Sequence, residues 1–308
     1  MQLKALFVAA LIVAAPGAAQ TVVMTPAGTI TNDPSVVATG NDQSQRMTVP
    51  VMVNGQGPFQ FVIDTGADRT VISTELSDRL NLPAAGTARL HSMGGQSQVN
   101  IVSIDRVGYS NRIARDVKAA ALPMRNLGAD GLLGVDSLKG QRVVMDFVAQ
   151  TMSIESSSEA EAPVPADGAI IVVTARTRLG QLVMVDADAN GQKVWVVVDT
   201  GAQNSVGNSR LKQLLVKRNP ETPIKPMEMV DVIGRRTPAE YTIVSKVRIG
   251  GMTMQNAAIA FADAHPFKLF GLSKKPSMLL GMEGLRSFRR VSVDFASRKV
   301  KFLLQKEP

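Results

Sequence analysis

The sequence predicts a mainly β protein built from two similar β-barrel lobes that are related by a pseudo-twofold axis. Three observations lead to this prediction. Most apolar segments are short and are bounded by Gly, Asn and Asp, which is typical of strands. The tripeptide Asp-Thr-Gly occurs twice, at Asp64–Gly66 and at Asp199–Gly201. The landmarks around it recur in the same order in both halves, which indicates an internal duplication.

Each copy of the tripeptide ends an apolar, strand-like run and is followed by alanine. A carboxylate at the end of a buried strand costs free energy unless it is paired or has a chemical role. Two such carboxylates in matching settings, Asp64 and Asp199, therefore suggest a pair that meets at the axis between the lobes. The alternative is that each aspartate caps a strand-to-turn corner of a duplicated β domain.

A hairpin signal precedes each tripeptide. Asn54-Gly55 lies upstream of the first copy, and Asn190-Gly191 lies at nearly the same distance upstream of the second. Asn-Gly between apolar runs favours a tight hairpin turn, because both residues tolerate positive φ. We therefore expect a two-stranded hairpin to lead into each aspartate.

The segments after each tripeptide also correspond. Ser73 or Thr74 in the first half, and Asn208 or Ser209 in the second, are expected to cap a short helix. The second half has extra residues, which we expect to form a loop around His265–Pro276. Three later landmarks also recur. A Leu-Leu-Gly element occurs at Leu132–Gly134 and again at Leu279–Gly281, and a short helix is expected to end at Leu138 and at Leu285. A final hairpin is expected to open at Val144–Phe147 and at Ser292–Phe295.

This order of motifs resembles that of the retropepsin-like (clan AA) aspartic proteases, seen twice in one chain. Single-copy members must dimerise to complete their site, whereas pepsin-like members carry two halves in one polypeptide. The chain looks like the second arrangement built from retropepsin-like halves, as in bacterial exported aspartyl proteases. The resemblance covers residues 43–305 and implies two acid-protease β-barrel lobes.

The resemblance implies that Asp64 and Asp199 form a catalytic dyad that hydrolyses peptide bonds. Two carboxyl groups so close together cannot both ionise readily and share one proton. The ionised member draws a proton from a bound water while the other donates toward the peptide carbonyl oxygen. The pair titrates as a unit, so neither role is assigned to one aspartate. This chemistry requires no cofactor and no metal.

The residues beside the aspartates have expected supporting roles. Gly66 and Gly201 let the backbone approach the carboxylates closely. By the resemblance, Thr65 and Thr200 face inward and hydrogen-bond across the axis, which holds the two loops together.

The next residues are expected to bind substrate. Asp68 matches the retropepsin position that binds the substrate main chain, whereas the second half has Gln203 there. Ala67 and Ala202 occupy a position where pepsin-like enzymes often have a hydroxyl, which can hydrogen-bond a carboxylate and favour its ionised form. Because alanine cannot do this, we expect less acidic dyad pKa values and an activity optimum at mildly acidic to neutral pH.

Two hairpins are candidates for flaps over the cleft. His91–Gln96 has Gly94 and Gly95 at its tip, and we favour it as the working flap. Val232–Arg236 is the corresponding segment of the second half, and either hairpin could instead be a plain connecting turn. A mobile hairpin would exclude water and hold an extended peptide through strand-like main-chain contacts.

The N-terminal sequence predicts export. Residues 1–19 have a signal-peptide pattern, with Lys4 as the sole charge, an apolar segment and small residues up to Ala19. The apolar segment is too short to span a bilayer comfortably, so we expect no integral membrane span after cleavage and a periplasmic or secreted location. An uncleaved anchor is the alternative. We expect the rest of the chain to be divided into a loose leader (20–42), a first lobe (43–154), a linker (155–168) and a second lobe (169–308).

Composition narrows the chemistry further. The chain has no cysteine, which excludes thiol nucleophiles and disulfides. Its two histidines, His91 (expected on a surface loop) and His265, cannot form an ordinary zinc site. The formal net charge is +8, but the basic residues are scattered without interleaved aromatic residues, so we expect no nucleic-acid partner.

The sequence therefore predicts an exported aspartic endopeptidase that acts on polypeptide substrates as a monomeric two-lobed chain. One alternative is an obligate homodimeric protease whose like halves pair between chains. Another is a non-catalytic peptide-binding module on the same fold. A basic envelope-binding structural protein has only the net charge in its favour. Both Asp-Thr-Gly motifs are intact, which favours an enzyme.

Overall fold

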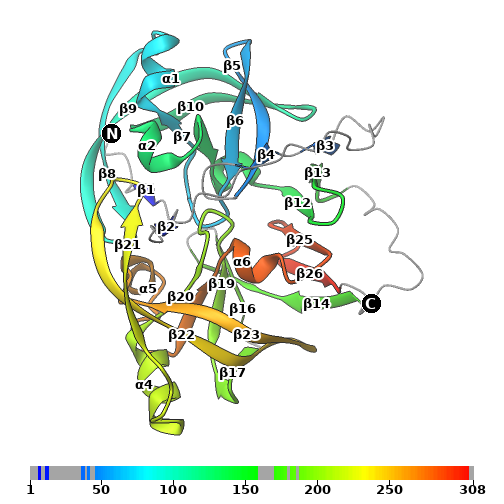
Figure 1. Cartoon of the computed structure of the whole chain (residues 1–308). Coiled ribbons are helices and arrows are strands. Elements are labelled where there is room, and N and C mark those ends of the chain that lie inside the picture. The colour runs from blue at the N-terminus through cyan, green and yellow to red at the C-terminus, as the bar shows by residue number, and fades with distance from the viewer. Residues whose placement is uncertain are drawn as a thin grey trace, which may run out of the picture.

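The computed structural model describes residues 6–7, 11–13, 36–38, 40–41, 46–158, 170–178, 181–184 and 187–304, and all structural statements below concern these residues. They are mainly β and form two lobes of matching topology, the first in blue to green and the second in green to red (Figure 1). The duplication predicted from the sequence is thus present in the fold.

The first lobe combines long strands with short strands and three short helices. Its elements are β5 (Met47–Val53), β6 (Gln56–Ile63), β7 (Val71–Ser73), α1 (Thr74–Arg79), β8 (Ala84–Ser92), β9 (Gly95–Tyr109), β10 (Arg112–Leu122), α2 (Met124–Leu127), β11 (Gly131–Leu133), α3 (Val135–Leu138), β12 (Gln141–Asp146) and β13 (Thr151–Ser156).

The second lobe repeats this order with additional elements. They are β14 (Ile170–Thr174), β15 (Arg176–Arg178), β16 (Gln181–Met184), β17 (Ala187–Ala189), β18 (Gln192–Lys193), β19 (Trp195–Val198), β20 (Ser205–Gly207), α4 (Ser209–Arg218), β21 (Lys225–Asp231), β22 (Arg236–Ile249), β23 (Met252–Phe261), α5 (His265–Leu269), β24 (Ser277–Leu280), α6 (Met282–Leu285), β25 (Arg290–Asp294) and β26 (Lys299–Leu303). Four short strands precede both lobes: β1 (Leu6–Phe7), β2 (Leu11–Val13), β3 (Val36–Ala38) and β4 (Gly40–Asn41).

The strand that carries each Leu-Leu-Gly element occupies the same place in both lobes. In the first lobe, β11 pairs in parallel with β6 and antiparallel with β7, and β7 pairs in parallel with β10. In the second lobe, β24 pairs in the same way with β19 and β20, and β20 pairs in parallel with β23. The end of each aspartate-bearing strand is therefore fixed against the Leu-Leu-Gly strand.

The two lobes share one sheet. Strand β12 of the first lobe pairs antiparallel with β25 of the second, and the final hairpins β12–β13 and β25–β26 extend it on both sides. The aspartates of these hairpins cap the turns: Asp146 accepts from the backbone of residues 148 and 149, and Asp294 from residues 296 and 297. Arg290 also binds Asp146 at 2.8 Å between Nη2 and Oδ2. The shared sheet thus joins the lobes at their base.

The predicted turns and caps are present. Asn54 and Asn190 have φ of 51° and 48°, and the glycine after each is also at positive φ, as a tight Asn-Gly hairpin requires. Ser73 caps α1 by accepting from Leu76 N, and Asn208 caps α4 by accepting from Leu211 N. Both lobes therefore follow local sequence signals at these points.

One expectation about a loop was wrong in part. The extra residues around His265–Pro276 include helix α5 rather than loop alone. Pro266 stands in the first turn, where the missing N–H of proline removes no helical hydrogen bond. Phe267 and Phe270 are buried in the apolar cluster of the second lobe and anchor the helix.

The boundaries predicted for the N-terminus and the linker stay predictions. Most of residues 1–42 lie outside the described residues, and these include most of the predicted signal peptide and leader. Of the predicted linker, 155–168, residues 159–168 are also outside, and β13 runs to Ser156. Within the part of the chain that is described, no helix is long and apolar enough to cross a membrane.

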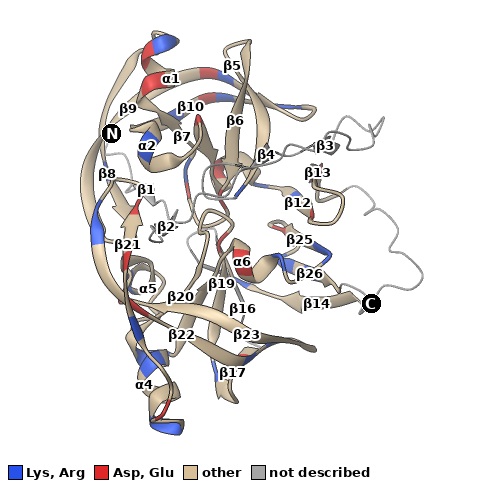
Figure 2. Ribbon diagram, in the orientation of Figure 1, with Lys and Arg blue, Asp and Glu red and all other residues tan. Residues whose placement is uncertain are grey.

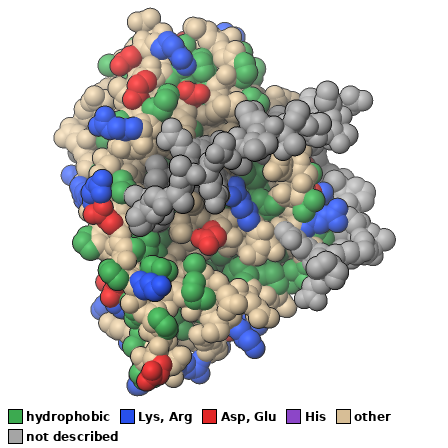
Figure 3. Space-filling view, viewed as in Figure 1, with side chains coloured by type: hydrophobic (Ala, Val, Ile, Leu, Met, Phe, Trp, Pro, Cys, Tyr) green, Lys and Arg blue, Asp and Glu red, His purple; other side chains and the backbone are tan. Residues whose placement is uncertain are grey.

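The surface carries charges of both signs on both lobes. Lys and Arg are distributed along strands and helices and alternate with Asp and Glu (Figure 2). The face seen in Figure 3 shows the same interspersed pattern. This distribution is that of an ordinary solvated surface.

We expect the two helix caps to differ in their contribution to stability. The Asn208 side chain forms four hydrogen bonds within the described residues, to the start of α4 and to the segment before β24, whereas Ser73 caps only α1. Asn208→Ala should lower the free energy of unfolding by about 2–4 kcal/mol, and Ser73→Ala by about 1 kcal/mol. Urea denaturation of both variants measures this, and equal losses would contradict it.

Candidate active site

The two aspartates stand at equivalent strand ends. Asp64 directly follows β6, and its backbone N donates to Leu133 O at 2.9 Å. Asp199 directly follows β19, and its N donates to Leu280 O at 3.0 Å. Both side chains are 0% exposed. The Leu-Leu-Gly strands therefore fix the backbone from which each carboxyl projects.

The glycine of each Leu-Leu-Gly element makes room for the loop that follows the aspartate of its lobe. A Cβ on Gly134 would lie 2.4 Å from the backbone carbon of Arg69, and one on Gly281 would lie 2.5 Å from the backbone oxygen of Asn204. Real Cβ atoms do not approach backbone so closely, so a side chain at either position would displace the loop. This packing role of the two glycines was not predicted from the sequence.

The threonines exchange hydrogen bonds between the lobes. Thr65 N donates to Thr200 Oγ1 at 3.0 Å, and Thr200 N donates to Thr65 Oγ1 at 3.1 Å. Each hydroxyl in turn donates to the strand of the opposite lobe, Thr65 to Val198 O at 3.0 Å and Thr200 to Ile63 O at 2.6 Å. The cross-axis arrangement implied by the resemblance is thus present in both directions.

The carboxyl groups meet where the two loops face each other. Asp64 Oδ1 accepts from Gly66 N at 2.8 Å, and Asp199 Oδ1 accepts from Gly201 N at 3.1 Å. A Cβ on Gly201 would lie 2.2 Å from Asp64 Cγ, so the carboxyl of one lobe rests against the loop of the other. The Oδ2 atom of each aspartate is buried and has no hydrogen-bond partner among the described residues.

Burial sets the protonation of this pair. Loss of solvation raises the pKa of Asp64 from 3.8 to about 6, against the opposing effects of the Arg46 guanidinium and backbone N–H groups. Loss of solvation and the charge of Asp64 raise the pKa of Asp199 well above its usual range. At mildly acidic to neutral pH the pair therefore holds one proton, which gives one acid and one base in the same site.

Arg46 was not identified from the sequence. It lies just before β5, and its side chain is 0% exposed. No pattern distinguishes it in the sequence from a surface arginine at the start of a strand, because its partners come from distant segments.

The residues after each tripeptide fasten the loops to two short helices. Ala67 O accepts from Val135 N at the start of α3, and Ala202 O accepts from Met282 N at the start of α6. Ala67 and Ala202 are both fully buried. Asp68, which is partly exposed, continues this pattern, because its O accepts from the backbone of residue 136. Direct contact of these residues with substrate stays a prediction.

The two candidate flaps contact each other through Asp231. His91–Gln96 forms the turn between β8 and β9, and Asp231 ends β21 where the second candidate begins. The buried Asp231 carboxylate accepts from Ser92 Oγ at 2.6 Å and from Gly94 N at 3.1 Å in the first hairpin. Its other oxygen accepts from Arg235 N at 2.9 Å within its own hairpin. One carboxylate therefore binds both hairpins.

Arg235 adds a second connection. Its Nη1 donates to Gly94 O at 2.6 Å, and its Nη2 donates to Gln96 O at 3.2 Å. A Cβ on Gly94 or Gly95 would lie 2.7 Å or less from an atom of this side chain. The glycines predicted to face substrate therefore also make room for the opposite hairpin.

Each hairpin inserts one apolar side chain into the opposite lobe. Met93 belongs to the buried cluster of the second lobe, which is otherwise made of residues such as Val197 and Leu279. Val232 belongs to the cluster of the first lobe, together with Val62 and Leu132. The exchange is reciprocal, in keeping with the pseudo-twofold symmetry of the fold.

The expected surface position of His91 was wrong. His91 is the second-last residue of β8 and is 7% exposed. Its ring lies parallel to that of His265 on α5, with 2.7 Å between Nδ1 of His91 and Nε2 of His265. Burial and the neighbouring charges of His265 and Arg89 lower the pKa of His91. The polar sequence around a hairpin turn gave no indication of α5, which covers this side.

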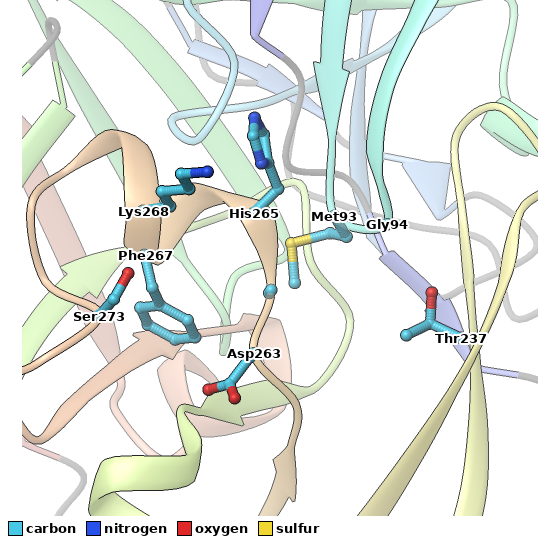
Figure 4. A pocket seen from close by; sticks show the side chains of 9 residues that line it. Met93, Gly94, Thr237, Asp263, His265, Phe267, Lys268 and Ser273 are labelled. Atoms are coloured by element: carbon cyan, nitrogen blue, oxygen red, sulfur yellow. The ribbon is translucent and has the colours of Figure 1, made fainter.

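A pocket of about 380 Å³ opens beside this contact. Met93, Gly94 and Thr237 of the hairpins line one side, and His265 and Lys268 of α5 line the other (Figure 4). The tips of the two hairpins and α5 of the second lobe therefore pack together around this pocket.

Fold and site together define the class of two-lobed acid-protease folds with a buried carboxyl pair at the lobe interface. The family described as aspartyl protease matches the chain twice, over residues 49–137 and 185–283. The two matches contain Asp64 and Asp199, respectively, and the chain belongs to this family. No curated protein matches the chain.

We expect Asp64→Asn to stabilise the protein at neutral pH. A pKa raised from 3.8 to about 6 means that the folded state binds the proton more tightly than the unfolded state. Stability from this group is therefore full below pH 3.8 and is lost as the pH rises through 6. The amide, which cannot ionise, should raise the free energy of unfolding at pH 7 by on the order of 2 kcal/mol.

Chemical denaturation at neutral pH and near pH 4 measures this difference. The gain should shrink toward the acidic condition, where the parent carboxyl is protonated. Asp116→Asn, at an exposed aspartate, is the control for the change of a carboxylate to an amide. Equal destabilisation by Asp64→Asn at both pH values would contradict the prediction.

Proposed function

We propose that this protein is an aspartic endopeptidase in which the Asp64/Asp199 dyad activates a water molecule for peptide hydrolysis. The observation that carries the proposal is the pair of fully buried carboxyls on two loops locked together by Thr65 and Thr200. Burial of two carboxyls at one point is unfavourable for stability, which indicates a chemical role.

The dyad works as one acid and one base. The ionised carboxyl takes a proton from water, whose oxygen bonds to the peptide carbonyl carbon, while the protonated carboxyl donates to the carbonyl oxygen. In the second half, the C–N bond of the tetrahedral intermediate breaks, and the carboxyl that took the proton from water gives it to the departing nitrogen. The other carboxylate takes a proton from a hydroxyl of the intermediate as the product C=O forms, so the dyad again holds one proton. The buried Oδ2 atoms of Asp64 and Asp199 are the positions from which these transfers start.

A peptide would be held as an additional strand. Two short strands of this chain already pair with the flap strands, β1 in parallel with Leu90–His91 of β8 and β2 antiparallel with Met229–Asp231 of β21. These pairings support a cleft whose walls bind extended backbone. Asp68, Gly94 and Gly95 are the residues that we assign to substrate contact.

One chain supplies both carboxyls, which favours a monomeric enzyme over one completed by a second copy. The export pattern of residues 1–19 supports action in the periplasm or outside the cell. We propose polypeptides as substrates and assign no metal or cofactor to the reaction.

The test is cleavage of a mixed-peptide library by the purified protein from acidic to mildly basic pH. Asp64→Asn and Asp199→Asn should each lower kcat/KM by roughly 10²–10⁴-fold, since each removes the acid–base pair. Asp116→Asn should cleave like the parent. Sedimentation of each variant as a folded monomer completes the experiment. A folded parent that cleaves no peptide at any pH would instead favour a peptide-binding module.

The pH profile should be bell-shaped, with its acidic limb near pH 6. Below that limb both carboxyls are protonated and no base remains, and above the basic limb both are ionised and no acid remains. A profile that peaks near pH ~2, where the pepsin pair is half ionised, would reject the assignment.

We also propose that the two hairpins act as one flap unit. Arg235→Ala removes the contacts to Gly94 and Gln96 and should lower kcat/KM about 10-fold, mainly through KM, since a charge-assisted hydrogen bond contributes about 1.5 kcal/mol or more. The matched control is Arg236→Ala, which should have kinetics like those of the parent. Arg236 is exposed and pairs with Glu228 on the adjacent strand β21, not with the opposite hairpin. Peptide kinetics with both variants measure the effect, and equal kinetics for the two would contradict it.

A further inference from the structure

Arg46 is a buried cation at the junction of the two catalytic loops. It belongs to the first lobe and is the largest of the fully buried side chains in the described part of the chain. A guanidinium cannot lose its proton in a protein, so it remains charged when buried. Burying such a charge is costly unless hydrogen bonds and an opposite charge compensate it.

The hydrogen bonds of Arg46 connect α2 of its own lobe to the Asp199 loop of the second lobe. Its Nη1 donates to Gly201 O at 3.0 Å, and its Nη2 donates to Leu127 O at the end of α2. Gly201 is the residue whose Cα rests against the Asp64 carboxyl, and its N binds Asp199. Arg46 therefore holds a peptide segment that touches both carboxyls.

The charge of Arg46 acts on both members of the dyad. It opposes the rise in the pKa of Asp64 more strongly than any other group, and it also lowers the pKa of Asp199. Besides the two carboxyls themselves, Arg46 is the charged group that acts on both. A dyad with one proton carries one negative charge, so the buried site as a whole becomes neutral when Arg46 is included.

We propose that Arg46 is a positioning residue that fixes the Asp199 loop against Asp64 and supplies the buried positive charge that keeps one carboxyl of the dyad ionised. This role rests on the proposed function, because it concerns the same carboxyls. It differs from a purely structural role in one respect: it depends on the charge of the side chain as well as on its hydrogen bonds.

Two variants separate charge from hydrogen bonding. Arg46→Gln keeps an amide that can donate to Gly201 O but removes the charge, and Arg46→Lys keeps the charge with fewer donors. The control is Arg142→Gln at the lobe interface, where the replaced arginine is also buried but binds Glu155 on the shared sheet. Loss of a buried arginine as such should affect Arg46→Gln and Arg142→Gln alike.

The first readout is the titration of the Asp64 and Asp199 carboxyls by ¹³C NMR in the purified, folded proteins. Arg46→Gln should move the first ionisation of the pair upward by about 1 pH unit, because a nearby arginine lowers a carboxyl pKa by one unit or more. Arg46→Lys and Arg142→Gln should titrate like the parent. The second readout is the pH profile of peptide cleavage, whose acidic limb should move by the same amount in Arg46→Gln alone.

The titration keeps this inference separate from the proposed function. A parent that cleaves no peptide would overturn the enzyme assignment, yet the carboxyl titration would still test Arg46. Unchanged titration in folded Arg46→Gln would overturn the inference, and so would an equal shift in Arg46→Lys. If Arg46→Gln does not fold, Arg46→Lys tests the inference instead. A first ionisation of the dyad that lies a full pH unit from that of the parent in this variant would overturn the inference, because the positive charge is still present.

Discussion

Two carboxyl groups that repel each other and lose their hydration must be held at one point by two different lobes. Everything else in the structure follows from this constraint. Each aspartate directly follows a strand that pairs in parallel with the Leu-Leu-Gly strand, and its backbone N–H also binds that strand, so its position is fixed. The reciprocal bonds of Thr65 and Thr200 then tie the two loops directly to each other. Hydrogen bonds between buried neutral groups supply this connection without adding charge to the site.

Three sets of contacts connect the lobes, and each set is nearly symmetric about the pseudo-twofold axis. They are the β12–β25 strand pair, the hydrogen bonds between Thr65 and Thr200, and the burial of Met93 and Val232 in the opposite lobes. The departures from symmetry are chemical. Arg46 comes from one lobe only, and it opposes the rise in the pKa of Asp64 more strongly than it acts on Asp199. This difference gives equivalent aspartates unequal surroundings, which favours unequal sharing of the proton.

Local signals made the duplicated fold and the aspartates predictable. Asn54-Gly55 specifies its turn through positive φ, and Ser73 and Asn208 specify helix starts through their own side chains, so a short window of sequence is enough. Arg46 and Asp231 could not be identified in this way. Their partners lie in segments more than eighty residues distant or in the other lobe, and their roles arise only after the lobes have assembled.

The flap contacts bear on how a peptide could reach the dyad. Met93 and Val232 are each buried in the lobe opposite their own hairpin, so moving either hairpin exposes apolar surface that costs about 1.5–3 kcal/mol per side chain. One oxygen of the Asp231 carboxylate accepts a hydrogen bond from Ser92 in the first hairpin, and the other accepts one from the backbone N of Arg235 in the second. Displacing one hairpin therefore breaks contacts of the other at the same time. Under the proposed function, the two hairpins therefore open together, and an entering peptide replaces interactions from both lobes at once.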